Sequence, residues 1–413
     1  MSTACVKARV APPAFKEAAV AAIDDVRRLA LRGLVLLKGL LLNGKPLNGR
    51  LLKALGLASG AALMAPTARA VDLPEDRAEA MVHVYNGGGV RATGPALLVR
   101  KSLADKFSVT GALYVDMVSN ASIDVVTTAS PYRENRTEWT MGVDHAVQDA
   151  LLHVGVSRSS EPDYTATTVS ADISQEVFGG MSTISLGFAR GQDDVGKHNE
   201  VAWNDRARHW QYRLGLTQIL SPRWVLSING EALADDGYLG SPYRVAQVFG
   251  SAVPERVPRT RNGRAIKFRL IGDVGSDGLR SAVRAEYRYY RDTWAVQAHT
   301  VEAGYSRYFG DAWLADGYVR FNRQSDALFF SDNADSETRY VTRNRQLSAF
   351  TGTSLGAKLT WTPGGPTAQA WQLKLHGALE VLRFNYQHFT DIRTGRPYGF
   401  TGQVLQLYAT AKF

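Results

Sequence analysis

The feature that most restricts the fold of this chain is a period-two alternation of apolar and polar side chains, clearest in its last eleven residues. Between Gln403 and Phe413, the apolar side chains of Leu407 and Ala411 share one face of an extended strand with Phe413, because successive side chains of a strand point to opposite faces. This pattern is typical of a strand with lipid on one side and a polar lumen on the other. The final edge strand of a soluble β-domain could alternate in the same way, so the rest of the chain has to decide.

The same alternation recurs in residues 109–117, 224–231, 266–274, 279–290 and 371–381. In 279–290, Val283 and Tyr287 share one face, and Arg284 and Arg288 share the other. A charged side chain at the lipid-facing midplane costs about 2–4 kcal/mol, whereas a wet lumen accepts it. The alternation therefore predicts a lumen wall that contains Asp116, Glu138, Asp172, Glu176, Glu231, Lys267, Arg269, Arg280, Arg284, Glu286, Arg288, Arg320 and Lys374.

The acidic members of this set come mainly from the first half of the chain and the basic members mainly from the second. If the barrel closes, we expect opposite walls of the lumen to carry opposite charge. A transverse field of that kind orients polar solutes in diffusion channels. The alternative is a set of salt bridges that stiffen a closed barrel.

Turns and links divide the chain after residue 70 into strands. Short turns are expected near residues 104–106, 146–149, 178–180, 221–223, 275–278, 309–311 and 363–366. Longer links are expected near 86–94, 119–132, 159–164, 191–204, 233–263, 327–344 and 387–400, with one tight link near 291–293. Seven turns at one end and eight links at the other predict an all-β, transmembrane antiparallel β-barrel of about 16 strands (range 14–16), and single-chain bacterial barrels have an even strand count. A soluble sandwich has no reason to place its long loops at one end.

The N-terminal segment has the features of a cleaved signal peptide. Basic residues precede a short apolar run from Ala54 to Ala65, and Ala68-Arg69-Ala70 follows as a cleavage site,. The chain thus divides into residues 1–70, an N-terminal extension and signal peptide cleaved after Ala70, and residues 71–413, the barrel. Residues 1–46 are either a real extension or the product of a misassigned start, and a soluble helical hairpin is the alternative for the whole segment.

Charge and cysteine content exclude several classes of function. Residues 1–70 contain eleven Lys and Arg against three Asp and Glu, whereas the rest contains 37 basic and 36 acidic residues. The basic character therefore belongs to the N-terminus and gives no support for nucleic-acid binding. The only cysteine is Cys5, which excludes disulfides and cysteine nucleophiles from the barrel.

Nearly the whole chain after residue 70 resembles a known group of proteins, and the resemblance is densest over residues 73–145. The sequences Tyr85-Asn-Gly-Gly-Gly-Val90 and Tyr114-Val-Asp-Met-Val118 are similar to an uncharacterised (domain-of-unknown-function) family of proteobacterial outer-membrane proteins. The terminal Phe413, with Ala411 and Leu407, resembles the assembly signal of such barrels.

This resemblance implies the Gram-negative cell outer membrane, with its lipid, lipopolysaccharide and the barrel-assembly machinery as partners. Genes of the family often neighbour a periplasmic flavin transferase and thioredoxin-like proteins, so the resemblance also implies periplasmic redox partners. It implies no cofactor and no catalytic residue, and it leaves the oligomeric state open.

No motif in the chain predicts an enzyme or a metal site. Gly352-Thr-Ser354-Leu-Gly356 matches a nucleophile-elbow pattern, but Ser354 lies within an alternating strand and no helix follows,. The long 233–263 link is either a pore-constricting loop or a surface loop. The sequence therefore predicts a pore or transport protein for small polar solutes. A non-channel partner of a periplasmic redox or flavinylation system is the alternative, and an outer-membrane hydrolase is a weaker one.

Overall fold

The computed structural model describes residues 71–120, 132–197, 200, 202–276, 278–364 and 371–413. The predicted signal peptide with Ala68 and Ala70 lies outside these residues, so its cleavage and the division at residue 70 stay predictions.

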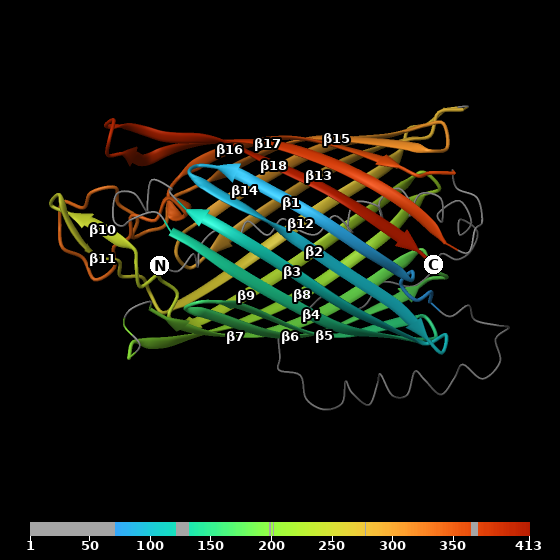
Figure 1. Cartoon of the computed structure of the whole chain (residues 1–413), viewed down its shortest axis with the longest axis horizontal. Helices are drawn as coiled ribbons and strands as arrows, with labels where there is room; N and C mark the ends of the chain where they lie inside the picture. Colours follow the sequence, from blue (N-terminus) through green and yellow to red (C-terminus); the bar gives the residue numbers. More distant parts are fainter. Residues whose placement is uncertain (1–70, 121–131, 198–199, 201, 277, 365–370) are drawn as a thin grey trace, which may run out of the picture.

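Eighteen strands make up almost all of the regular structure of the described residues (Figure 1). A three-residue 3-10 helix, η2 (Arg345–Leu347), lies between β15 and β16. Among the described residues, no helix is long and apolar enough to span a membrane. The strands are β1 (Arg77–Gly87), β2 (Val90–Leu103), β3 (Phe107–Asn120), β4 (Tyr132–Val147), β5 (Ala150–Glu161), β6 (Tyr164–Val177), β7 (Ser182–Gly196), β8 (Asn204–Ser221), β9 (Trp224–Gly237), β10 (Val245–Val248), β11 (Ser251–Pro254), β12 (Thr260–Asp273), β13 (Ser281–Asp292), β14 (Gln297–Phe309), β15 (Trp313–Gln324), β16 (Phe350–Trp361), β17 (Gln372–Asp391) and β18 (Arg396–Lys412).

Sixteen of these strands form a closed antiparallel barrel, and β10 and β11 form a separate hairpin. Each barrel strand pairs with its neighbours in the chain, and β18 closes the barrel against β1, with Met81 opposite Tyr408 and Tyr85 opposite Val404. The predicted fold class and strand number are confirmed. The last strand, whose alternation is clearest, thus closes the barrel against the first strand.

The alternation arises because the outer surface of the barrel is apolar. Leu97, Leu214 and Leu355 point outward and keep 51%, 57% and 66% of their surface exposed. On β18, Leu405 and Leu407 are exposed, whereas the intervening polar residues point inward. An apolar exterior that no other described part of the chain covers requires lipid around it.

The connections differ from the expectation at several places. The expected long links 86–94 and 159–164 are two-residue hairpin turns in the structure. Gly88 and Gly89 have φ of 60° and 79°, which is the backbone of the tight type I′ turn. The link near 387–400 is mostly strand, with a turn only at 392–395. Two links are long as expected: 238–259, which contains β10 and β11, and 325–349.

Candidate functional site

The inward face of the barrel carries a row of directly opposed charged residues on β6 to β9. Asp172 lies opposite Gly187, Gly187 opposite Arg213, and Arg213 opposite Glu231. Arg213 donates from Nη2 to Asp172 Oδ1 at 2.7 Å, across the strand between them. The contact is possible because Gly187 has no side chain: a Cβ there would overlap Asp172 Oδ1 and lie 2.8 Å from Arg213 Nε. Glycine on the intervening strand thus lets one ion pair join two non-adjacent strands.

A second row continues the charges over β12 to β17. Arg284 Nη2 lies 2.7 Å from Glu302 Oε1, and Arg320 Nη2 lies 2.6 Å from Glu302 Oε2. Arg269 and Lys267 both pair with Glu286, at 2.7 Å and 2.6 Å. Two longer pairs complete the set, Arg320 with Glu380 and Arg288 with Glu231, each at 3.4 Å.

We call these two rows the charged belt. It consists of Asp172, Arg213, Glu231, Lys267, Arg269, Arg284, Glu286, Arg288, Glu302, Arg320 and Glu380, and most of its members lie near the middle of their strands.

Several cations of the belt face water, whereas two of its carboxylates are covered. The side chains of Arg213, Arg288 and Arg320 are 37%, 39% and 36% exposed, against 8% for Glu302 and 11% for Glu286. These side chains point into a closed barrel, so the exposed guanidinium groups require water-accessible space inside it. A lumen that keeps ionised groups hydrated can accept small polar solutes.

The wall formed by β1 to β5 contains both signs of charge. His83 Nε2 lies 2.7 Å from Asp116 Oδ1, and its ring stacks on Tyr114 with centroids 4.7 Å apart. Arg136 pairs with Glu138 and approaches Asp116 at 3.5 Å. On the opposite wall, the carboxylates of Glu286 and Glu302 lie among arginines. Each wall therefore contains both signs of charge and pairs many of them locally. A difference in net charge between the opposite walls stays a prediction.

The predicted lumen residues do not all gather at the belt. Glu176 lies beside the β4–β5 turn, where its backbone N–H donates to Asp149 O. Arg280 lies next to a turn and pairs with Asp311 at 2.9 Å, and Lys374 is the third residue of β17. These three lie toward the C-terminal end of the barrel. Conversely, Arg136, Arg213 and Glu302 face inward but were not among the residues predicted for the lumen wall, although the same alternation places them there.

Two long connections, which we call the mouth loops, lie at the end of the barrel opposite the C-terminus (Figure 1). They are residues 238–259 and residues 325–349. Their backbones pair directly, since Arg256 and Val341 exchange hydrogen bonds of 3.0 Å and 2.8 Å. Ala246, Val248, Ala334 and Val341 form a small apolar core between them. The mouth loops therefore fold as one unit.

The 325–349 loop packs against the inner wall of the barrel. Arg345 is 6% exposed, and its guanidinium lies 5.7 Å and 5.6 Å from the ring centroids of Tyr398 and Phe400 on β18. Arg343 lies over the ring of Phe389 at 4.3 Å and donates to the Thr390 carbonyl at 2.6 Å. This buried segment narrows the mouth.

The 238–259 loop contacts the rim of the barrel near the β5–β6 turn and the link between β7 and β8. The Tyr243 hydroxyl donates to Asp163 at the β5–β6 turn, and Tyr238 packs edge-on against Trp203. Burial raises the pKa of Tyr238 to about 12, so its phenol stays neutral. The prediction that the 233–263 link constricts the pore stays a hypothesis. The structure adds the 325–349 loop as a second segment that could constrict it.

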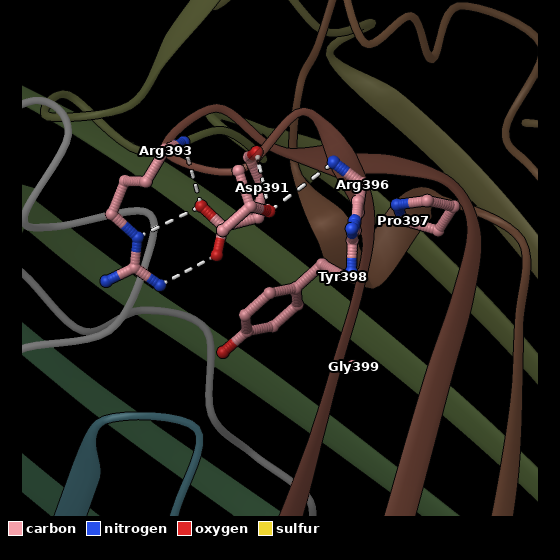
Figure 2. A pocket seen from close by; sticks show the side chains of 7 residues that line it. Asp391, Arg393, Arg396, Pro397, Tyr398 and Gly399 are labelled. Carbon is pink, nitrogen blue, oxygen red and sulfur yellow. Dashed lines mark hydrogen bonds and ion pairs between the residues drawn. The ribbon is translucent and has the colours of Figure 1, made fainter.

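A shallow hollow of about 560 Å³ lies at the tip of the β17–β18 hairpin, outside the lumen. In Figure 2 the Arg393 side chain folds back onto Asp391, with Nε 3.0 Å from Oδ1 and Nη2 2.8 Å from Oδ2. This ion pair lies at the tip of a hairpin, whereas the belt lines the lumen, so the belt is the better candidate for a functional site.

The described residues contain no group of three His, Cys, Asp or Glu side chains that could hold a metal ion. Ser354 points into the lumen from the middle of β16, opposite Arg320, and is 7% exposed. It lies in a strand rather than on the strand-to-helix turn that a nucleophile elbow requires.

The geometry described above defines the class of this protein as a transmembrane β-barrel with a charged lumen. Residues 195–376 match the model of a family described as a protein of unknown function (DUF3570). That match confirms, over residues 195–376, the predicted resemblance to a domain-of-unknown-function family. No curated protein matches the chain.

Solved structures with a similar fold share little sequence with this chain. CdiB from Acinetobacter baumannii is 8% identical with a TM-score of 0.46, and the match covers 81% of this chain and 60% of CdiB. A bacterial polysaccharide outer membrane secretin is 8% identical with a TM-score of 0.46, covering 83% and 100%. Pseudomonas aeruginosa OpdK with vanillate is 10% identical with a TM-score of 0.42, covering 82% and 98%. The chain thus spans less than two thirds of CdiB.

Proposed function

We propose that this protein is a pore of the Gram-negative outer membrane that admits small polar solutes through the charged belt. The observation that carries the proposal is the exposure of Arg213, Arg288 and Arg320 inside a closed barrel. Fully buried ion pairs would contact only the wall and could not meet a solute in the lumen. The cost of removing them from water would also offset most of their mutual attraction. Charges that remain hydrated can instead interact with solutes that pass them.

The interleaved signs of the belt favour polar and zwitterionic solutes over one sign of ion. Glu302 is held between Arg284 and Arg320, and Glu286 between Lys267 and Arg269. A solute at this level therefore meets donors and acceptors side by side. We expect weak selectivity between anions and cations.

The mouth loops make the pore restrictive at its outer end. The packing of Arg343 and Arg345 against β17 and β18 narrows access while the rest of the lumen stays hydrated. We place the mouth loops on the outer side of the membrane, so that the end of the barrel with the C-terminus faces the periplasm. The proposed role involves no catalysis, and the partnership with periplasmic redox proteins stays a prediction from the family resemblance.

Planar-bilayer conductance of the purified protein tests the proposal. We expect discrete current steps in potassium chloride, and larger steps from the Arg343→Ala/Arg345→Ala double variant, in which the mouth segment loses its contacts. Arg280→Gln, at a turn outside the belt, is the matched control and should conduct like the wild type. Absence of current from both the wild type and the double variant would overturn the proposal, because the second lacks the contacts that hold the constriction.

A further inference from the structure

Arginines recur at one level of the outward face of the barrel. On each of seven strands, an exposed arginine follows the outward-facing apolar and aromatic side chains. It lies two residues closer to the mouth than the last of them and faces outward as they do. We call this set the arginine collar. It consists of Arg158 on β5, Arg190 on β7, Arg208 on β8, Arg264 on β12, Arg291 on β13, Arg323 on β15 and Arg383 on β17.

The collar marks the edge of the lipid-facing surface. Directly below it, Phe188, Ile266 and Phe321 are 39%, 39% and 47% exposed on the same outward faces. A guanidinium two residues above such a side chain lies where hydrocarbon gives way to headgroups, since outward residues along one strand alternate with inward ones. The arginines are thus placed at headgroup height.

The opposite end of the barrel ends differently. There the outward faces finish in exposed apolar side chains, among them Phe107 (42%), Leu220 (53%), Trp313 (40%) and Phe413 (46%). Such residues are typical of an ordinary aromatic and apolar girdle. The concentration of arginine at the mouth end therefore indicates a leaflet whose headgroups are strongly anionic.

The collar is densest on β12 to β15. Arg264 and Arg291 are direct cross-strand partners, and Arg323 is the direct partner of His299. Like charges placed directly opposite each other are destabilising. Among the described residues, no carboxylate pairs with Arg264, Arg291 or Arg323. An external anion is what would relieve this repulsion.

We propose that the arginine collar binds the phosphate groups of a phosphorylated, multiply acylated glycolipid of the lipid A class, with Arg264, Arg291 and Arg323 forming its principal site. Arginine suits this ligand because its planar guanidinium donates two parallel hydrogen bonds to a phosphate. The acyl chains lie along the apolar strip of Ile266, Val301 and Phe321 beneath it. A free phosphate compound would satisfy the arginines but would leave this strip unused. The site is independent of whether the lumen conducts.

Binding of purified lipid A to the whole protein in detergent tests the proposal, with the bound fraction measured by native mass spectrometry. The test variant is Arg264→Gln/Arg291→Gln/Arg323→Gln. We expect at least tenfold weaker binding of lipid A to this variant. Dephosphorylated lipid A should bind the wild type as weakly as it binds the variant, and inorganic pyrophosphate at the same concentration should not displace lipid A from the wild type.

A matched control removes three cations from the other end of the barrel, Lys106→Gln/Arg223→Gln/Arg307→Gln, and should leave lipid A binding unchanged. The charge-preserving Arg→Lys triple at the collar should retain part of the affinity, and heat-modifiable gel mobility shows that each variant is folded. Equal binding of lipid A by the wild type and the glutamine triple would overturn the proposal. So would equal loss from the control triple, or full displacement by pyrophosphate, which would indicate a site for soluble phosphate instead.

Discussion

Neutralising Glu302 should change the ion selectivity of the pore by a predictable amount. Glu302 pairs with both Arg284 and Arg320 at the centre of the charged belt. In Glu302→Gln each arginine keeps a second carboxylate, because Arg284 lies 3.3 Å from Glu286 and Arg320 lies 3.4 Å from Glu380. The wall should therefore stay assembled while the belt gains one net positive charge.

The size of the effect follows from Coulomb's law in a hydrated lumen. A unit charge roughly 8 Å from a permeating ion, in water of dielectric constant about 80, contributes about 0.5 kcal/mol. An anion gains this energy and a cation loses it, so their permeability ratio should shift by about 1 kcal/mol, which is roughly fivefold. At molar salt the Debye length falls to about 3 Å, and the shift should largely disappear.

Reversal potentials across a planar bilayer with a tenfold potassium chloride gradient measure this ratio. Glu302→Asp keeps the charge and serves as the matched control, and Asp311→Asn removes an exposed carboxylate at a turn and should have no effect. An unchanged reversal potential in folded, conducting Glu302→Gln at low salt would refute the assignment of the belt to the permeation path.

Four further predictions concern stability, assembly and access. Gly187→Val should lower the free energy of unfolding by about 1–3 kcal/mol, measured in urea, because its side chain separates Arg213 from Asp172. Hydrogen bonds from Lys101 and Ser102 of β2 lower the pKa of Asp76, before β1, to about 2, so the stability that Asp76 adds to the β1–β2 pairing is full above pH 3.8 and is lost toward pH 2. Hydrogen exchange in β1 and β2 should rise over that interval in the wild type but not in Asp76→Asn. Arg345→Ala alone should raise conductance, since burial of its side chain holds the mouth segment inside the rim; an unchanged conductance would contradict this. Deletion of Phe413 should reduce membrane insertion, and normal insertion of the shortened chain would show that it is no assembly signal.

The alternation was enough to predict the fold because lipid and water act on opposite faces of every strand. Leu407 and Phe413, which the alternation placed on one face, are both exposed on the outside of the barrel. Loop lengths were harder to predict, because a polar stretch can be either a link or the outer part of a strand. Residues 387–391 and 396–400 are polar and aromatic, yet they form the extended tip of the β17–β18 hairpin.

The charged belt could be predicted only in part. Alternation shows which residues face inward, but it does not show which strands lie side by side at which register. Arg284 and Glu302 belong to different strands, and their ion pair follows from the β13–β14 register. Arg213 reaches Asp172 only because Gly187 intervenes. The expectation of segregated charge did not foresee these local ion pairs, because it summed the charges of each half of the chain instead of pairing residues across strands.

The mouth loops have a mechanical consequence for the barrel. A chain of contacts runs from Asp163 at the β5–β6 turn through Tyr243 and the paired backbones of Arg256 and Val341 to Arg343 and the Thr390 carbonyl on β17. These anchors lie on well-separated arcs of the rim. The loops therefore act as a strut across the opening, which resists flattening of the barrel under lateral pressure from the bilayer. At the other end, the described connections join only neighbouring strands, so the cross-section there should deform first.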